Sequence, residues 1–432
     1  MDTIFSSASN FQKSAIKIVR VSGKNSKTVP SIFSFKATKP RFASLRKLYD
    51  HKNKIIDNVL VIFFPGPFTA TGEDVIELHF HGSVVIEKKI FQMLSKQKNF
   101  RLAEPGEYTK RAFFNGILDL TQAEGLNDLI NSETESQFKL SMLQFEGALS
   151  EKVASWRNDI VLLLSKLEAL IDFSDEELPL DLEKNFIIKV LALLKDMKIS
   201  IKSSSYGERL RNGFIVTLVG RPNVGKSSLI NFLSQRKVAI VTEEPGTTRD
   251  VIEAFLDFDG YPIILNDTAG IRLAKSEIEK IGIKKAIEKA EKSDLILILS
   301  DDENFTLEGI KDKSKSFLIH TKSDLSKLSR KDVHEISVKD NKGIDQLIKS
   351  IVEYLRSLTP KENALLTKER HVLAVKKASD ALRRVSLTNL NTKPELASED
   401  LRIAATAIGS ITNTIDVEEI LDDIFKNFCI GK

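Results

Sequence analysis

The most constraining feature of the sequence is the run Gly220-Arg-Pro-Asn-Val-Gly-Lys-Ser227. It follows the apolar segment Phe214–Val219 and precedes Ser228–Gln235, which has helical character. A glycine-rich loop between a strand and a helix binds phosphate, because its backbone N–H groups point at phosphate oxygens. The alternative is a tight glycine turn without a ligand. The context favours the first interpretation and predicts a site for a nucleoside triphosphate.

Individual residues of this loop have separate expected roles. Gly220 and Gly225 let the backbone wrap around the phosphates. Lys226 supplies a positive charge to the β- and γ-phosphates, and the Ser227 hydroxyl can bind Mg²⁺.

The chain of 432 residues is long enough for two or three domains. Residues 1–115 combine turn signals with short apolar runs, which predicts a small α+β domain. Residues 106–178 contain no proline, and their apolar residues recur at helical spacing, which predicts a helical bundle.

Residues 213–357 alternate between strand and helix patterns and predict a doubly wound parallel sheet with one antiparallel pair. Asp259-Gly260 would be the hairpin turn of that pair. Helical patterns return at Leu365–Leu387, Ser398–Ile408 and Val417–Phe428. We therefore expect a multidomain α/β plus α protein, in which one helical domain (116–212 and 358–432) is interrupted by the inserted nucleotide domain. The predicted strands are Phe214–Val219, Val251–Phe258, Tyr261–Leu265, Leu295–Leu299, Ser316–His320 and Val333–Ile336.

Three further motifs have the order and spacing of a Ras-like GTPase. They are Gly246-Thr-Thr-Arg-Asp250, Asp267-Thr-Ala-Gly270 and Thr321-Lys-Ser-Asp324. Asp267 would hold the Mg²⁺ shell, the Gly270 N–H would reach the γ-phosphate, and Thr247 or Thr248 would cap the metal only when that phosphate is present.

The last motif predicts guanine as the base. Guanine presents N1–H and N2–H₂ side by side, and the Asp324 carboxylate can accept both. Lys322 would pack over the base, and Ser337-Val-Lys339 is a further base contact. Asn is commoner than Thr at position 321, so we expect weaker affinity for guanine.

Two residues distinguish this site from that of Ras. Ile271 stands where Ras-like enzymes use Gln to orient water, so another group must do so. The Asn223 side chain, with backbone carbonyls from Thr242–Thr247, can hold a monovalent cation beside the phosphates. The alternative role for Asn223 is a hydrogen bond within the loop.

Composition adds few constraints. The net charge of +4 permits a nucleic-acid partner without arguing for one. Apolar runs are too short to span a membrane, and the first residues lack a signal-peptide pattern. The lone cysteine, Cys429, excludes an internal disulfide. We expect a cytoplasmic protein.

Three segments outside the nucleotide domain complete a specific pattern. They are Thr71-Gly-Glu-Asp-Val-Ile-Glu-Leu78 with His81-Gly82, Pro105-Gly-Glu107 through Leu118-Asp-Leu-Thr-Gln-Ala-Glu124, and Cys429-Ile-Gly-Lys432. With these, essentially the whole chain resembles the MnmE (TrmE) family of tRNA modification GTPases.

The resemblance implies an N-terminal folate-binding domain that forms a homodimer. It also implies a heterotetramer with the flavoprotein MnmG. Together, the two proteins would attach an aminomethyl or carboxymethylaminomethyl group at C5 of the wobble uridine of certain tRNAs. The one-carbon unit would come from a 5,10-methylene- or 5-formyl-tetrahydrofolate, and GTP hydrolysis would use Mg²⁺ and be stimulated by K⁺.

The resemblance also implies site residues. Ser227 and Thr248 would bind Mg²⁺, and Glu279 would orient water, although without the family Glu279 is one charge on a solvated helical face. The implied K⁺ ligands are Asn223, Thr242, Glu244 and Thr247. The implied folate contacts are Arg20, Glu77 and Lys432. The implied GTP contacts are Asn223, Val224, Gly225, Lys226, Ser227, Ser228, Thr242, Glu243, Glu244, Pro245, Gly246, Thr247, Thr248, Asp267, Thr268, Ala269, Gly270, Thr321, Lys322 and Asp324.

Catalytic roles are implied for Lys226, Glu279 and Cys429; the alternative for Cys429 is a small residue packed at a helix end. The sequence departs from the family at Ser9–Ser14, where glycines are usual, and at Ile117, where a folate-contacting Lys is common. The competing function is that of an Era-type regulatory or ribosome-assembly GTPase. Such proteins carry an RNA-binding module after the GTPase unit instead of Thr71–Leu78 and the Cys429 tail.

Overall fold

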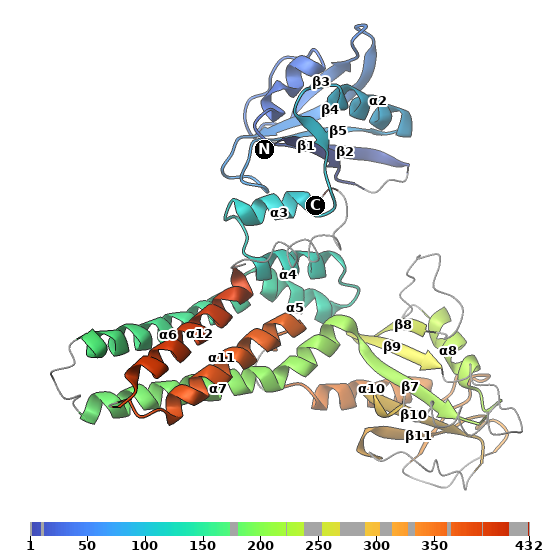
Figure 1. The fold of residues 1–432 in the computed structure, drawn as a ribbon. Helices are drawn as coiled ribbons and strands as arrows, with labels where there is room; N and C mark the ends of the chain where they lie inside the picture. Colours follow the sequence, from blue (N-terminus) through green and yellow to red (C-terminus); the bar gives the residue numbers. More distant parts are fainter. Residues whose placement is uncertain are drawn as a thin grey trace, which may run out of the picture. The chain divides into compact units, whose positions relative to one another are not determined.

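The computed structural model describes residues 2–9, 13–172, 180–221, 223–236, 253–267, 290–302, 313–326, 333–360, 364–390, 392–413 and 431 (Figure 1). The chain divides into two compact units. The first comprises residues 1–127, 145–155 and 408–432, and the second comprises residues 128–144 and 156–407.

The first unit is built on a six-stranded sheet with the order β3-β4-β5-β2-β1-β6. Neighbouring strands in this sheet are antiparallel, except that β1 and β6 are parallel. The strands are β1 (Thr3–Ser7), β2 (Ser14–Ser22), β3 (Ser44–Tyr49), β4 (Ile55–Phe64), β5 (Val75–Gly82) and β6 (Phe100–Leu102).

Helices of this unit contribute to a core on one face of the sheet. Ile90 and Leu94 of α2 are fully buried in the same cluster as Phe5, Leu48 and Leu78 from the strands. The Ser83 side chain caps α2 by accepting a hydrogen bond from the N–H of Val85. The helices are α1 (Val29–Ile32), α2 (Val84–Ser95), α3 (Glu107–Phe114) and α4 (Leu120–Ile130), which ends in the second unit.

The second unit contains the predicted doubly wound sheet. Its order is β12-β11-β10-β7-β9-β8, and every pairing is parallel except that of β8 with β9. The central strands are nearly continuous apolar runs, as is typical of parallel strands with both faces covered. The strands are β7 (Phe214–Gly220), β8 (Glu253–Phe258), β9 (Tyr261–Asp267), β10 (Leu295–Ser300), β11 (Ser316–His320) and β12 (Val333–Glu335).

Two helices beside this sheet have clear sequence causes. Helix α8 (Lys226–Gln235) starts directly after the glycine-rich loop. Helix α10 (Ile344–Ser357) buries residues three and four apart, which form one apolar stripe against the sheet. The antiparallel pair turns at Asp259 and Gly260, both in the left-handed region, so the predicted hairpin is confirmed.

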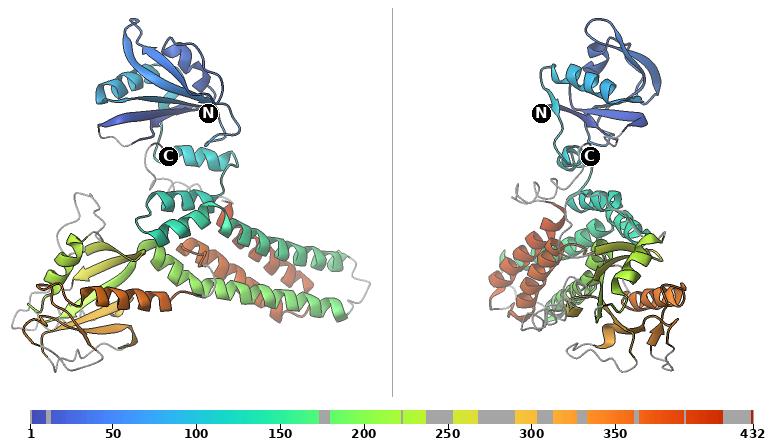
Figure 2. Two further views of the ribbon diagram at one scale, coloured as in Figure 1. Left: turned by 180° about the vertical axis from the view of Figure 1, so that it is seen from behind. Right: turned by 90° about the vertical axis from the view of Figure 1, so that its right-hand side faces the viewer.

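The remaining helices pack as a bundle, and Figure 2 shows α6, α7, α11 and α12 running side by side. Trp156 donates to Asp196 between α6 and α7, and Arg384 pairs with Asp400 between α11 and α12. Arg402 of α12 pairs with Glu168 of α6. The helices are α5 (Glu135–Phe145), α6 (Ala148–Asp172), α7 (Leu180–Asn212), α11 (Glu369–Leu387) and α12 (Pro394–Thr412).

The bundle therefore combines helices that precede the nucleotide domain in the sequence with helices that follow it. The predicted multidomain α/β plus α fold class is confirmed. Two helix starts differ from the prediction. Helix α11 begins at Glu369 instead of Leu365, because the Leu365 carbonyl accepts a 2.5 Å hydrogen bond from Gln144 instead of a helical one. Helix α12 begins at Pro394, a residue suited to a first helical turn. The predicted helix Val417–Phe428 lies outside the described residues.

Candidate functional site

The glycine-rich loop has the geometry of a phosphate-binding loop. Gly225 takes a φ of 104° and directly precedes α8, and as glycine it offers no side chain to cap the helix. The first N–H groups of the helix are therefore directed at the space enclosed by the loop, where an anion is stabilised by them and by the helix dipole.

The start of the loop requires glycine for a different reason. A Cβ atom on Gly220 would lie 2.5 Å from the carbonyl oxygen of Leu299. The ammonium of Lys226 donates to the carbonyls of Gly220 and Arg221 at 2.8 and 2.9 Å. This side chain is buried and curls back over the loop, so its charge lies where the loop would enclose phosphate.

The sheet brings the distant motifs to the same edge. In register, Gly220 of β7 lies beside Leu299 of β10, and Ser300 of β10 lies beside His320 of β11. The loops after these three parallel strands consequently converge at the carboxyl ends, where such sheets bind ligands. The buried Thr321 joins two of the loops, because its hydroxyl donates to the carbonyl oxygen of Val224 at 2.7 Å.

The predicted base-binding residues gather in the loop after β11. Lys322 has a φ of 56°, and its ammonium lies 2.9 Å from the carboxylate of Asp301. The hydrogen bond from Lys322 lowers the pKa of Asp301. Asp324 accepts a 2.9 Å hydrogen bond from the Ser337 hydroxyl, so the structure brings together two of the predicted base-binding residues.

Other predicted nucleotide residues are described in part. Asn223 has a φ of 61°, and Ser227 and Ser228 lie in the first turn of α8. The backbone of Asp267 pairs with Leu218, close to the start of the loop. Residues 242–248 and 268–270 and Glu279 lie outside the described residues, as do Cys429 and Lys432.

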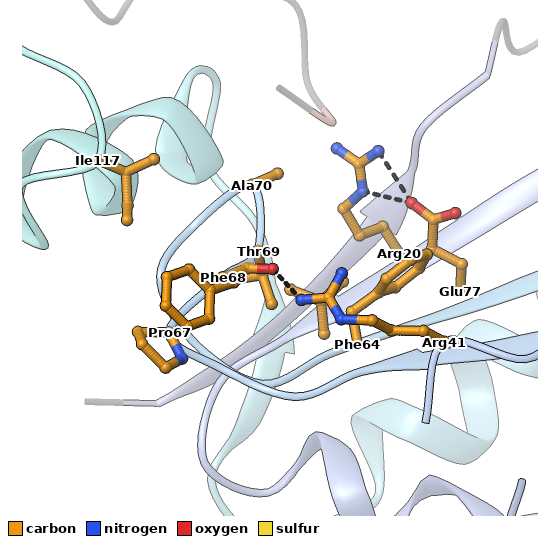
Figure 3. A pocket seen from close by; sticks show the side chains of 10 residues that line it. Arg20, Arg41, Phe64, Pro67, Phe68, Thr69, Ala70, Glu77 and Ile117 are labelled. Carbon is orange, nitrogen blue, oxygen red and sulfur yellow. Dashed lines mark hydrogen bonds and ion pairs between the residues drawn. The ribbon is translucent and has the colours of Figure 1, made fainter. Parts of the chain in front are cut away.

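A second site lies in the first unit, where a cavity of about 430 Å³ opens beside the sheet (Figure 3). Two of the three predicted folate contacts are among its walls. The Arg20 guanidinium lies 2.9 Å from the Glu77 carboxylate. The cavity is lined by Arg20, Arg41, Phe64, Pro67, Phe68, Thr69, Ala70, Val75, Glu77 and Ile117.

The Glu77 carboxylate is held in its ionised form. A hydrogen bond with His79 at 3.2 Å, followed by the charge of Arg20, lowers the pKa of Glu77. The other wall of the cavity includes the apolar side chain of Ile117, at the position where the family resemblance predicts a Lys. This departure therefore falls inside the cavity.

The Thr71–Leu78 segment supports the loop that lines the cavity. Glu73 accepts hydrogen bonds from Ser22 and from the buried guanidinium of Arg111, each at 2.8 Å. Asn115 donates to the Thr71 carbonyl at 2.6 Å. These contacts fix the segment that directly follows the wall residues 67–70. The hydrogen bonds from Ser22 and Arg111 explain why the motif has an acidic residue at position 73, whose carboxylate accepts both.

Gly431 also belongs to the first unit. It has a φ of 107°, and a Cβ atom there would lie 2.2 Å from the carbonyl oxygen of Ser7 in β1. Only a glycine fits this approach, which brings the backbone of residue 431 against the sheet that carries Arg20 in β2.

Sequence reasoning did not identify Arg41, Phe64 or Phe68 as wall residues. They carry no motif, and only the pairing of β4 with β5 brings Phe64 to Val75 at the cavity. Among the described residues, no helix has the length and apolarity needed to cross a membrane.

The sheet order, the glycine-rich loop and the convergent base-binding loop define a P-loop GTPase domain inserted in a helical protein. Two family models match the chain, "GTP-binding protein TrmE N-terminus" at residues 3–117 and "MnmE helical domain" at residues 120–429. The chain belongs to the MnmE family, and it binds and hydrolyses GTP.

Curated relatives agree over the full length. Proteins named tRNA modification GTPase MnmE from Bradyrhizobium sp. (strain ORS 278) and Rickettsia bellii (strain RML369-C) are 40% and 42% identical. Each alignment covers 100% of this chain and 99% or 100% of the relative. Among solved structures, the G domain of the T. maritima FeoB iron transporter covers 33% of this chain at 29% identity. Its TM-score is 0.26.

Proposed function

We propose that this protein is a GTPase that takes part in the modification of tRNA, as the names of its relatives say of them. With the flavoprotein MnmG, it would add an aminomethyl or carboxymethylaminomethyl group at C5 of the wobble uridine. The observation that carries the proposal is 40% identity over the entire chain, with the N-terminal, helical and nucleotide parts all present.

In the nucleotide domain, the residues fit GTP with Mg²⁺. The loop supplies N–H donors and the Lys226 ammonium, while the Ser227 hydroxyl and Thr248 would hold Mg²⁺, which neutralises charge on the phosphates when bound. Asp324, oriented by Ser337, would accept the paired donors of guanine. The remaining proposed GTP contacts are Asn223, Val224, Gly225, Ser228, Asp267, Thr321, Lys322 and residues 242–248 and 268–270.

A monovalent cation would complete this site. Asn223 has a left-handed backbone conformation, and the oxygen of its side-chain amide is a suitable ligand for K⁺. Thr242, Glu244 and Thr247 would be the other ligands. Glu279 would orient the attacking water in place of Ile271.

The cavity of the first unit fits a tetrahydrofolate derivative. A pterin ring presents N–H and NH₂ donors side by side, as guanine does, and the ionised Glu77 can accept both. A volume of about 430 Å³ is within the usual range for a ligand of this size. Arg20 would hold Glu77 in place, and Lys432 would contact the ligand. Gly431 lies against β1, which supports the proposed folate contact of Lys432 and the proposed catalytic role of Cys429.

These sites imply a division of labour among three domains. Residues 1–115 would bind folate and form a homodimer, residues 213–357 would hydrolyse GTP, and residues 116–212 with 358–432 would connect them. The protein would act in the cytoplasm, together with its tRNA substrates.

Mass spectrometry of tRNA tests the proposal. Nucleosides from cells with and without this protein are compared, and cells without it should lack the modified wobble uridine. Reintroducing the gene should restore the modification, whereas the Lys226→Ala variant should not. An unchanged nucleoside profile would overturn the proposed modification and leave an Era-type binding switch as the function.

A further inference from the structure

We propose that Arg41 binds the carboxylate at the tail of the folate and so makes the cavity selective for ligands that carry this tail. The inference rests on the proposed folate function. It concerns a residue that no sequence motif marks and that faces the same cavity as Arg20 and Glu77.

The position of Arg41 is fixed by several contacts. Its backbone N–H donates to the carbonyl oxygen of Phe63 at 2.7 Å, and its guanidinium donates to the carbonyl oxygen of Phe68. The guanidinium also lies over the ring of Phe64, 5.9 Å from the ring centre. Figure 3 shows the guanidinium extending between these wall residues toward the cavity. The group is therefore oriented before any ligand arrives.

The backbone of Arg41 is unusual. Its φ of 58° lies in the left-handed region, which residues other than glycine, asparagine and aspartate seldom adopt. Such conformations persist where the surrounding structure enforces them, and they are frequent at ligand sites. Here the backbone N–H of Arg41 is bound to the Phe63 carbonyl and its guanidinium to the Phe68 carbonyl, so both the backbone and the side chain of this residue are held in place.

The charges in the cavity favour an anion. The charge of Arg20 is matched by Glu77, which lies 2.9 Å away. Arg41 has no carboxylate within ion-pairing distance in the part of the chain that the structure describes, and its hydrogen-bond acceptors there are backbone carbonyls. Ile117 adds no charge to the facing wall. Two guanidinium groups and one carboxylate leave an excess of one positive charge.

The two ends of a folate match this arrangement. The pterin end offers N–H donors, which suit a carboxylate, while the tail ends in glutamate carboxylates. A guanidinium presents parallel N–H donors that bind a carboxylate in a two-pronged manner, and partial desolvation strengthens the contact. The apolar side chains of Phe64 and Phe68 would contact the aromatic ring between these ends. We infer that Glu77 selects the pterin and Arg41 selects the tail.

Two ligands that differ only in the tail test the inference. Isothermal titration of the full chain with 5-formyltetrahydrofolate and with the amide of 5-formyltetrahydropteroic acid, which ends in an uncharged amide in place of the glutamate, gives the preference for the tail. We expect the wild type to bind the glutamate-bearing ligand on the order of tenfold more tightly. In Arg41→Gln this preference should fall to less than about threefold, with affinity for the tail-free ligand nearly unchanged.

Matched variants separate charge from folding. Arg41→Lys keeps the charge and should retain part of the preference. Arg46→Gln removes an arginine from β3 whose guanidinium donates to the carbonyls of Lys36 and Leu45, outside the cavity lining, and should keep all of it. Thermal unfolding and circular dichroism of each variant verify the fold.

Three outcomes are decisive. A preference that disappears only in the Arg41→Gln variant supports the inference. A wild type that binds both ligands equally, or an Arg41→Gln variant that keeps the preference, overturns it and leaves the folate function intact. A wild type that binds neither ligand overturns the folate function, and the inference with it.

Discussion

The Thr321 hydroxyl lies 2.7 Å from the carbonyl oxygen of Val224, to which it donates a hydrogen bond. Thr321 follows β11 and Val224 belongs to the phosphate-binding loop, so this contact joins two loops that are about a hundred residues apart. Thr321 is almost completely buried, so its hydroxyl makes this connection away from solvent.

Replacing Thr321 with valine should weaken GTP binding. The variant keeps the shape of the side chain but removes the donor, which leaves the Val224 carbonyl without this partner. A lost buried hydrogen bond costs about 1–3 kcal/mol, so the Kd for a fluorescent GTP analogue should rise about tenfold. Thr321→Ser keeps the hydroxyl and should bind nearly as well as the wild type. Equal affinities for all three proteins would show that the two loops are held together by other contacts.

Replacing Asp324 with asparagine should change the preferred base. The carboxylate, which is hydrogen-bonded to Ser337, accepts two donors from guanine. An amide offers one acceptor and one donor, which suits xanthine, since its C2 position carries an oxygen in place of the amino group. We expect the affinity for GTP to fall at least tenfold and that for xanthosine triphosphate to rise, measured by competition binding. A variant that keeps its preference for GTP would exclude Asp324 from base recognition.

The sequence predicted most of the nucleotide domain, because its strands are apolar runs bounded by turn residues. The geometry of the loop from Gly220 to Ser227 could also be predicted from its glycines, because each one is required by a close approach of backbone atoms or by a positive φ. The start of α11 was less predictable. The periodic pattern extends to Leu365, but Gln144, from a helix far away in the sequence, takes the carbonyl that a helix would use.

The cavity of the first unit was predictable only in part. The family resemblance gave Arg20 and Glu77, which are neighbours because β2 pairs with β5. Arg41 and Phe68 lie in segments between strands, where a charged or an exposed aromatic residue has no periodic signal. Tertiary contacts alone show that they line the same cavity as Ile117.

The Arg20–Glu77 ion pair should make the stability of the N-terminal sheet depend on pH. The hydrogen bond with His79, and then the charge of Arg20, lower the pKa of Glu77 from its ordinary 4.5. A carboxylate with a lowered pKa stabilises the folded state fully above pH 4.5, and this contribution is lost as the pH falls through the lowered value. Glu77→Gln should therefore destabilise the sheet by about 1–3 kcal/mol at pH 7 and by less below pH 4.5.

Hydrogen exchange of peptides from β2 and β5 measures this effect locally. Fluorescence of the single tryptophan would not, because Trp156 belongs to the second unit. Glu104→Gln removes an exposed carboxylate near the same sheet and should change exchange little at any pH. A difference between Glu77→Gln and the wild type that stays constant from pH 7 to pH 4 would contradict the assignment.

Asn223 should make GTP hydrolysis depend on the monovalent cation. Its side-chain oxygen would hold K⁺ beside the phosphates, so turnover should be at least about tenfold faster in KCl than in NaCl. Asn223→Gly removes the oxygen while tolerating the φ of 61°, and its rates in the two salts should be equal. Asn223→Asp keeps an oxygen and also tolerates this conformation, so it should retain the K⁺ dependence. Equal wild-type rates in KCl and NaCl would reduce Asn223 to a loop-forming residue.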